Sequence, residues 1–163
     1  MPDIKPGIGV LNTFKNQKTE IQFALGEYVD NSVDSYFKNK VELENLDPDY
    51  KPYIDIAFDP YENTIVIEDN CAGIHEEDEE RAFMIGTQNP NQQDIGTYGM
   101  GMKVSSFWFC PNWEVETKPL NENFKKTYQI NLDEILENGK TKDRKIKSDA
   151  DPFTKITLKN VYK

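Results

Sequence analysis

The sequence has few of the residues on which disulfide frameworks and zinc clusters depend. It contains two cysteines, Cys71 and Cys110, and a single histidine, His75. Two cysteines do not make a disulfide framework, and one histidine does not complete a Cys/His zinc cluster. The chain also has no apolar run near the roughly 20 residues that a membrane-spanning helix needs, and its first residues lack the apolar segment of a signal peptide. We therefore expect a cytoplasmic protein without a membrane span.

Basic residues are outnumbered. The chain carries 19 Lys and Arg against 29 Asp and Glu, a formal net charge of -10. Broad contact with nucleic acid needs clustered Lys and Arg, so we do not expect this domain to bind nucleic acid directly. The acidity does not exclude a nucleotide-binding pocket, because backbone N–H groups and Mg²⁺ can balance phosphate charge. Solubility explains the acidity more simply than an acidic docking face does.

The length and the apolar pattern predict one domain, residues 1–163, with its own core. Apolar residues recur at helical spacing over residues 17–40, which predicts a long helix. Segments 53–58 and 64–68 alternate apolar and polar residues around turn residues 59–63, which predicts a β-hairpin.

The second half of the chain predicts further helices and strands. The expected elements are a short acidic helix at 76–85, a lid-like mobile loop at 86–99, a helix at 100–109, strands at 113–118, 127–132 and 154–158, and an exposed loop at 138–151. Together they indicate an α/β fold, a two-layer sandwich of helices on a mixed, mostly antiparallel sheet.

The long helix carries three polar residues on one face. Glu27 and Asn31 are four residues apart, and Asn31 and Asp34 are three apart, so all three side chains project together. A solvated helix face explains acidic residues equally well. Asn31 is the most informative of the three, because asparagine has a low propensity for helix interiors and its presence there indicates a specific role.

Two later segments place polar residues at strand ends. Asp69 directly follows an expected strand and begins the run to Gly73 and Ile74, where an aspartate can accept a hydrogen bond from an exocyclic amine. Gly73 allows a close backbone approach. Thr154 heads the last expected strand. An ordinary turn and an ordinary strand remain the alternatives for these two segments.

The most specific pattern is the glycine-rich run that leads into the helix at 100–109. Gly96, Gly99 and Gly101 leave backbone N–H groups and the helix dipole free to face an anion, and Lys103 adds a positive charge. A flexible hinge is the alternative. The spacing is neither that of a dinucleotide-binding fold nor that of a Walker A loop.

Taken in order, the four segments 27–34, 69–74, 96–103 and 154–158 resemble the GHKL ATPase superfamily of gyrase B, heat-shock chaperone ATPases, histidine kinases and MutL. The glycine-rich run is similar to MORC-type members at its end and to chaperone-type members at its start. The resemblance covers about residues 17–159 and implies the Bergerat ATP-binding fold.

The resemblance also implies roles for particular residues. Glu27 would be the general base for ATP hydrolysis, Asn31 would coordinate Mg²⁺, and Asp69 would bind the adenine amine, with Thr154 meeting Asp69. The other residues expected at the ATP site are Asp34, Gly73, Ile74, Gly96, Tyr98, Gly99, Met100, Gly101, Met102 and Lys103.

The resemblance further implies slow hydrolysis that drives conformational change or dimerisation, either with a second copy or with a partner domain. We expect the chain to be the N-terminal part of a longer protein. Three alternatives stay open: a nucleotide-gated interaction module without hydrolysis, a protein-kinase-type member of the superfamily, and a degenerate domain without nucleotide.

Overall fold

The structure, a computed structural model, describes residues 20–83, 100–138 and 141–162. Its elements are, in chain order, α2 (Ile21–Leu46), β1 (Ile54–Asp59), β2 (Thr64–Asp69), the 3-10 turn η1 (Glu76–Asp78), α3 (Glu79–Phe83), α4 (Met100–Phe109), β3 (Asn112–Lys118), β4 (Phe124–Asn131), α5 (Leu132–Asn138), β5 (Lys142–Lys147) and β6 (Phe153–Lys159).

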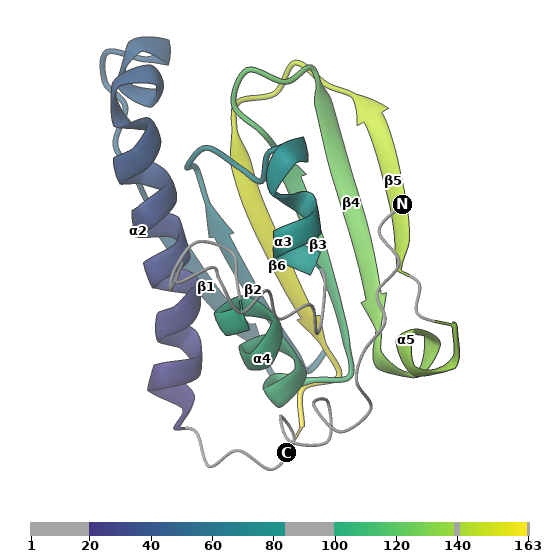
Figure 1. Cartoon of the computed structure of the whole chain (residues 1–163). Helices are drawn as coiled ribbons and strands as arrows, with labels where there is room; N and C mark the ends of the chain where they lie inside the picture. The colour runs from purple at the N-terminus through teal and green to yellow at the C-terminus, as the bar shows by residue number, and fades with distance from the viewer. Residues whose placement is uncertain (1–19, 84–99, 139–140, 163) are drawn as a thin grey trace, which may run out of the picture.

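The strands form one six-stranded sheet in the order β1-β2-β6-β3-β4-β5. Every pairing in it is antiparallel. Helices α2, α3 and α4 lie over one face of this sheet (Figure 1), which confirms the predicted two-layer α/β sandwich. The last strand, β6, returns to the middle of the sheet between β2 and β3, so the end of the described chain lies beside the hairpin near its start.

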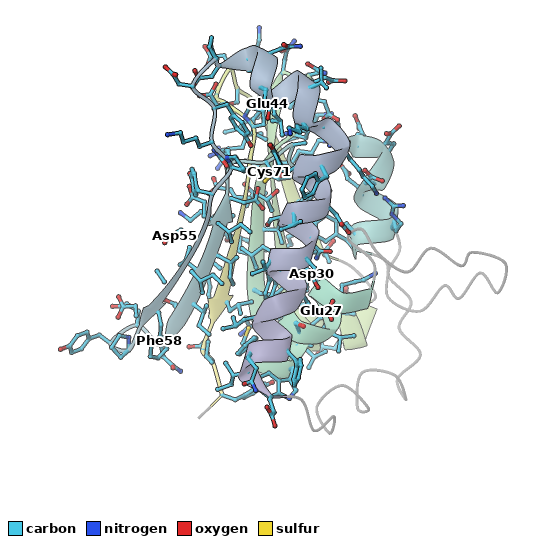
Figure 2. The ribbon with its side chains drawn as sticks, turned by 90° about the vertical axis from the view of Figure 1, so that its left-hand side faces the viewer. Glu27, Asp30, Glu44, Asp55, Phe58 and Cys71 are labelled. Carbon is cyan, nitrogen blue, oxygen red and sulfur yellow. The ribbon has the colours of Figure 1, made fainter. Side chains whose placement is uncertain are left out.

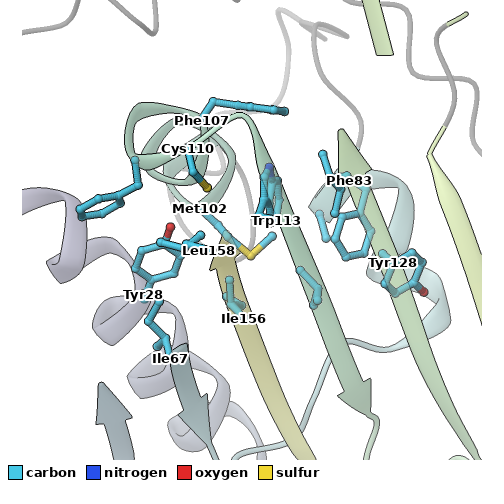
Figure 3. Packing of buried hydrophobic residues seen from close by; sticks show 14 of the residues in the cluster. Tyr28, Ile67, Phe83, Met102, Phe107, Cys110, Trp113, Tyr128, Ile156 and Leu158 are labelled. Atoms are coloured by element: carbon cyan, nitrogen blue, oxygen red, sulfur yellow. The ribbon is translucent and has the colours of Figure 1, made fainter. Parts of the chain in front are cut away.

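The core lies between the helices and the sheet. Alternate residues of β2 and β6 are buried, as period-two strands with one covered face require. Tyr28 from α2, Met102 from α4 and Ile156 from β6 project into the same interior (Figure 3). Trp113 and Phe107 meet edge to face, with their ring centroids 5.7 Å apart, a preferred arrangement of aromatic rings.

The predicted hairpin is confirmed as β1 and β2, and its turn follows from residue type. Asp59 Oδ1 accepts the backbone N–H groups of Tyr61 at 2.8 Å and Glu62 at 3.1 Å, the local bonding that favours aspartate in turns. Asn63 closes the turn with a φ of 51°, a left-handed conformation that asparagine tolerates.

Two elements near residue 140 differ from expectation. The exposed loop predicted for residues 138–151 contains strand β5, and the strand predicted for 127–132 gives way at Leu132 to helix α5. The side chain of Asn131 accepts the backbone N–H of Glu134 at 3.0 Å and so caps the first turn of α5. All six residues of β5 are exposed, so no hydrophobic alternation marked this strand in the sequence.

The long helix and the helix after the glycine-rich run agree with prediction. Helix α2 continues beyond the predicted residue 40, past a non-helical φ of -118° at Asn39. The predicted acidic helix is split into η1 and α3, and the predicted lid at 86–99 lies outside the described residues. None of the helices in the described part of the chain combines the length and the apolarity that crossing a bilayer requires.

Candidate nucleotide-binding site

A pocket lies where α2 and α4 meet the ends of β2 and β6. Its lining residues are Tyr28, Asn31, Ser32, Ile67, Asp69, Met102, Thr154 and Ile156. Four of them, Asn31, Asp69, Met102 and Thr154, are expected site residues, one from each of the four sequence segments. The fold therefore brings residues separated by more than a hundred positions in the chain to one place.

Asp69 is the charged group at the bottom of this pocket. It is 5% exposed, and its carboxylate accepts hydrogen bonds from Ser32 Oγ at 2.6 Å and from the Cys71 backbone N–H at 2.9 Å. Burial raises the pKa of the Asp69 carboxyl, and the hydrogen bonds from Ser32, from Cys71 and from the Thr154 backbone oppose that rise. The carboxylate is thus held in a fixed position in a dry environment.

Thr154 faces Asp69 across the β2–β6 ladder. Its hydroxyl oxygen is buried and has no hydrogen-bond partner among the described residues. A buried hydroxyl without a partner costs free energy, and this one lies beside a carboxylate in the lining of the same pocket. A fixed acceptor next to an unsatisfied hydroxyl fits a ligand that donates and accepts hydrogen bonds at one edge, as an aminopurine does.

Ser32 is the site residue that the sequence reasoning missed. It lies one helical turn after the buried Tyr28 on the core side of α2 and is 4% exposed. Its hydroxyl, however, reaches the carboxylate of Asp69. Ser35, one turn further along α2, accepts the backbone N–H of Ala72 at 3.2 Å. These two hydroxyls fix α2 against the end of β2 and the segment that follows it. Polar hydroxyl residues within an otherwise buried stripe were the available signal.

Glu27 lies at the contact between α2 and α4. A Cβ atom added to Gly101 would lie 2.0 Å from Glu27 Oε2, so the carboxylate lies directly against the first turn of α4 and would have to move if Gly101 carried a side chain. Glu27 is exposed (Figure 2) and is not part of the pocket lining. Asn31 is half-buried and lines the pocket, and the half-buried Asp34 does not.

Gly73 and Ile74 pack into the fold beside the pocket. Gly73 has a φ of 70°, and a Cβ atom there would lie 2.5 Å from the carbonyl oxygen of Lys118. The glycine is therefore required by its close approach to the end of β3. Ile74 is fully buried, and its backbone N–H donates to Thr117 Oγ1 at 2.9 Å. Neither residue is part of the pocket lining.

Lys103 is turned toward α3. Its side chain is buried, and its ammonium group donates to the backbone carbonyl of Arg81 at 3.0 Å. Burial lowers the pKa of Lys103 to about 8. Of the other expected residues in the glycine-rich run, Met100 begins α4, and Gly96, Tyr98 and Gly99 lie outside the described residues.

The comparisons with known proteins agree with this geometry. A family model described as "Histidine kinase-, DNA gyrase B-, and HSP90-like ATPase" matches residues 19–161, which is most of the chain. A search of curated proteins finds no match. Because the match includes both walls of the pocket, α2 with α4 and β2 with β6, the chain belongs to the family of histidine kinase-, DNA gyrase B- and HSP90-like ATPases.

Proposed function

We propose that this chain binds ATP with Mg²⁺ in the pocket between α2, α4 and the ends of β2 and β6, and hydrolyses it slowly. One observation carries the proposal: the buried Asp69 carboxylate, held by Ser32, lies beside the unsatisfied hydroxyl of Thr154 in the lining of one pocket. This pair accepts the adenine amine and bonds the adjoining ring edge, either directly or through a water molecule.

The other site residues have different roles in Mg²⁺ binding, water activation and phosphate binding. Asn31, which lines the pocket one helical turn after Glu27, offers the amide oxygen that would hold Mg²⁺. Bound Mg²⁺ would supply charge neutralisation for the phosphates. Glu27 orients and deprotonates the attacking water. Its carboxylate rests on the first turn of α4, where backbone N–H groups favour phosphate oxygens. Lys103 adds positive charge if its ammonium group exchanges the Arg81 carbonyl for a phosphate.

Binding is tested by calorimetric titration of a non-hydrolysable ATP analogue with and without Mg²⁺. We expect Mg²⁺ to tighten binding, and we expect Asp69→Ala to weaken it by about 100-fold, the effect of losing a hydrogen bond to a buried charged group. Glu68→Ala is the matched control. It removes the same charge one residue earlier in β2, on the half-buried face of the strand, and should bind the analogue like the wild type.

Hydrolysis is tested separately by phosphate release. Glu27→Gln should lower turnover by a factor on the order of 100 or more and change analogue affinity little. Unaltered turnover in Glu27→Gln would remove the general base from this proposal. Analogue binding with no phosphate release by the wild type would instead favour a nucleotide-gated interaction module.

We also propose that ATP binding drives conformational change or dimerisation within a larger protein, with this domain as its N-terminal part. The proposal rests on family membership. Its test is the effect of the ATP analogue on the oligomeric state of a longer chain that contains these residues, compared with the same chain carrying Asp69→Ala.

A further inference from the structure

The sheet has two edges of very different character. Among the described residues, β1 pairs only with β2 and β5 pairs only with β4. The β5 edge carries four cations in six residues, Lys142, Arg144, Lys145 and Lys147. Cationic side chains on an edge strand discourage pairing with another chain. The β1 edge, Ile54-Asp55-Ile56-Ala57-Phe58-Asp59, contains neither a cation nor a proline and so lacks this protection.

The β1 edge is also open. Five of its six residues are exposed, with Ile56 at 39% and Phe58 at 60%. Helix α2 directs Tyr28 toward α4 and Ser32 toward the end of β2, and the side chains of β1 from Asp55 onward are exposed. Figure 2 labels Asp55 and Phe58 on this edge strand. An exposed edge strand with apolar side chains and no cation or proline is a surface for strand addition.

The side chains of β1 separate cleanly by face. Ile56 is opposite the buried Ile67 of β2, and Phe58 is opposite the buried Ile65. Ile54, Ile56 and Phe58 therefore line the helix-covered face of the sheet, and Asp55, Ala57 and Asp59 line the other face. A strand that pairs with β1 must offer apolar residues on the first face and must not place carboxylates opposite Asp55 and Asp59.

We propose that the strand that fits this edge is β1 of a second copy of the chain, paired antiparallel about a two-fold axis with Ile56 opposite Ile56. In this register Ile54 lies opposite Phe58, so the apolar row continues across the interface. On the other face Asp55 lies opposite Ala57. The twelve strands of the two copies form one continuous sheet, with the helices of both copies on one side.

The carboxylates select this register. Side-chain alternation allows slips of two residues only, because a slip of one would exchange the two faces. A slip of two in one direction sets Asp55 opposite Asp59, and a slip in the other direction sets Asp55 opposite Asp55. Both slips oppose like charges in neighbouring positions, which destabilises strand pairing. Of these three registers, only the one centred on Ile56 sets no Asp of β1 opposite another Asp of β1.

Net charge distinguishes a second copy from any cationic partner strand. Each copy carries a net charge of -10, so two copies repel one another and salt weakens that repulsion. Self-association through β1 therefore strengthens as ionic strength rises. A basic partner segment at the same edge would show the opposite dependence.

The register is tested by cysteine cross-linking of the folded protein. Directly opposite Cβ atoms are about 4.5–5.5 Å apart, close to disulfide range, so Ile56→Cys should form a disulfide-linked dimer under mild oxidation. Both native cysteines are buried. Ala57→Cys tests the register, since its two copies would be diagonal neighbours about 7–8 Å apart. Ile146→Cys, 38% exposed on the opposite edge of the sheet, tests which edge is used. Neither control should cross-link.

Sedimentation of the wild-type protein tests the association without cysteines. We expect a monomer–dimer equilibrium that strengthens from low to physiological salt and that Ile56→Lys weakens by about tenfold or more. A wild type that stays monomeric, an Ile56→Lys variant that associates like the wild type, or a preferred Ala57→Cys cross-link would each overturn the proposal.

This dimer is independent of nucleotide. The Ile56→Cys cross-link should form equally with and without ATP analogue, and equally in a protein that also carries Asp69→Ala. If Asp69→Ala abolishes analogue binding and the cross-link still forms, the ATP site and the β1 interface are independent of each other. A cross-link that needs ATP would contradict the β1 proposal.

Discussion

At the scale of single residues, the hydroxyl of Ser32 determines how well the buried Asp69 carboxylate is held. We predict that Ser32→Ala destabilises the protein by about 1.5–3 kcal/mol at neutral pH, the usual effect of losing a hydrogen bond to a charged group. The lost bond opposes the burial-induced rise in the pKa of Asp69, so its removal raises that pKa further. A raised carboxyl pKa lowers stability as pH rises through it, so the loss should be smaller in acid, where the carboxyl group is protonated. Urea denaturation at acidic and neutral pH measures both effects.

Ser35→Ala is the matched control for Ser32→Ala. Ser35 is on the same helix and equally buried, but its hydroxyl accepts a neutral backbone N–H from Ala72. We expect a loss of about 1 kcal/mol with little dependence on pH. Equal and pH-independent losses for the two variants would show that the Ser32 bond does not control the ionisation of Asp69.

Single residues also show how far sequence reasoning reaches. Asn31, Asp69 and Thr154 are site residues that the resemblance to the GHKL ATPases predicts, and the fold brings all three into one pocket lining. Ser32 was not predicted as a site residue, because helical periodicity separates buried from exposed residues and says nothing about which buried hydroxyl meets which carboxylate. That contact depends on the angle between α2 and β2.

At the scale of elements, a glycine lies where the Glu27 side chain of α2 meets α4. A Cβ atom at Gly101 would lie 2.0 Å from Glu27 Oε2. We predict that Gly101→Ala displaces the Glu27 carboxylate and lowers ATP turnover by about tenfold or more. Analogue affinity should change less. Stability should change little, because the carboxylate is the flexible end of an exposed side chain and alanine favours helix. Phosphate release, analogue titration and urea denaturation measure the three effects.

Gly26→Ala provides the control in the facing helix. A Cβ atom at Gly26 meets nothing within 4 Å, so this variant should gain about 0.5–1 kcal/mol of stability from helix propensity and retain wild-type turnover. A Gly101→Ala variant with wild-type turnover would show that the position of Glu27 over α4 is not needed for hydrolysis.

Elements at the rim of the fold were the hardest to predict. Strands β2 and β6 alternate buried and half-buried residues, so their sequences carry the period of two. Strand β5 is an edge strand exposed along its length. Because neither of its faces is buried, its charged sequence has no apolar alternation and is indistinguishable from that of a loop. Helix α5 did leave a signal, the Asn131 cap followed by acidic residues in the first turn. Its seven residues are too few for a helical period of apolar residues to be recognised.

At the scale of the whole molecule, two buried lysines make opposite contributions to the pH dependence of stability. Burial lowers the pKa of Lys103 to about 8. Burial alone would also lower the pKa of Lys126, but the hydrogen bond and charge of Glu79, together with Glu122 and Glu76, raise it above its usual value. The difference is that Lys126 is surrounded by carboxylates, whereas burial dominates at Lys103, whose ammonium group donates to the backbone carbonyl of Arg81.

The sign for Lys103 follows from proton binding. Between pH 8 and the ordinary lysine pKa of about 10.4, the unfolded chain holds a proton that the folded chain has released, so stability rises with pH. Below pH 8 both states are protonated and the cost of burying the charge is constant. We therefore predict that Lys103→Met stabilises the protein at pH 7 and removes the rise in unfolding free energy between about pH 8 and 10. Urea denaturation across that range measures it.

Lys126→Met is the contrasting variant, because it removes a lysine that is equally buried. It leaves the carboxylate of Glu79 without its cation, so it should destabilise the protein by about 3 kcal/mol at pH 7 and leave the rise between pH 8 and 10 in place. If both variants lost stability in parallel, a net free-energy cost of burying the Lys103 charge would be disproved. If only Lys103→Met gained stability, the fold would carry a free-energy cost of burying the Lys103 charge.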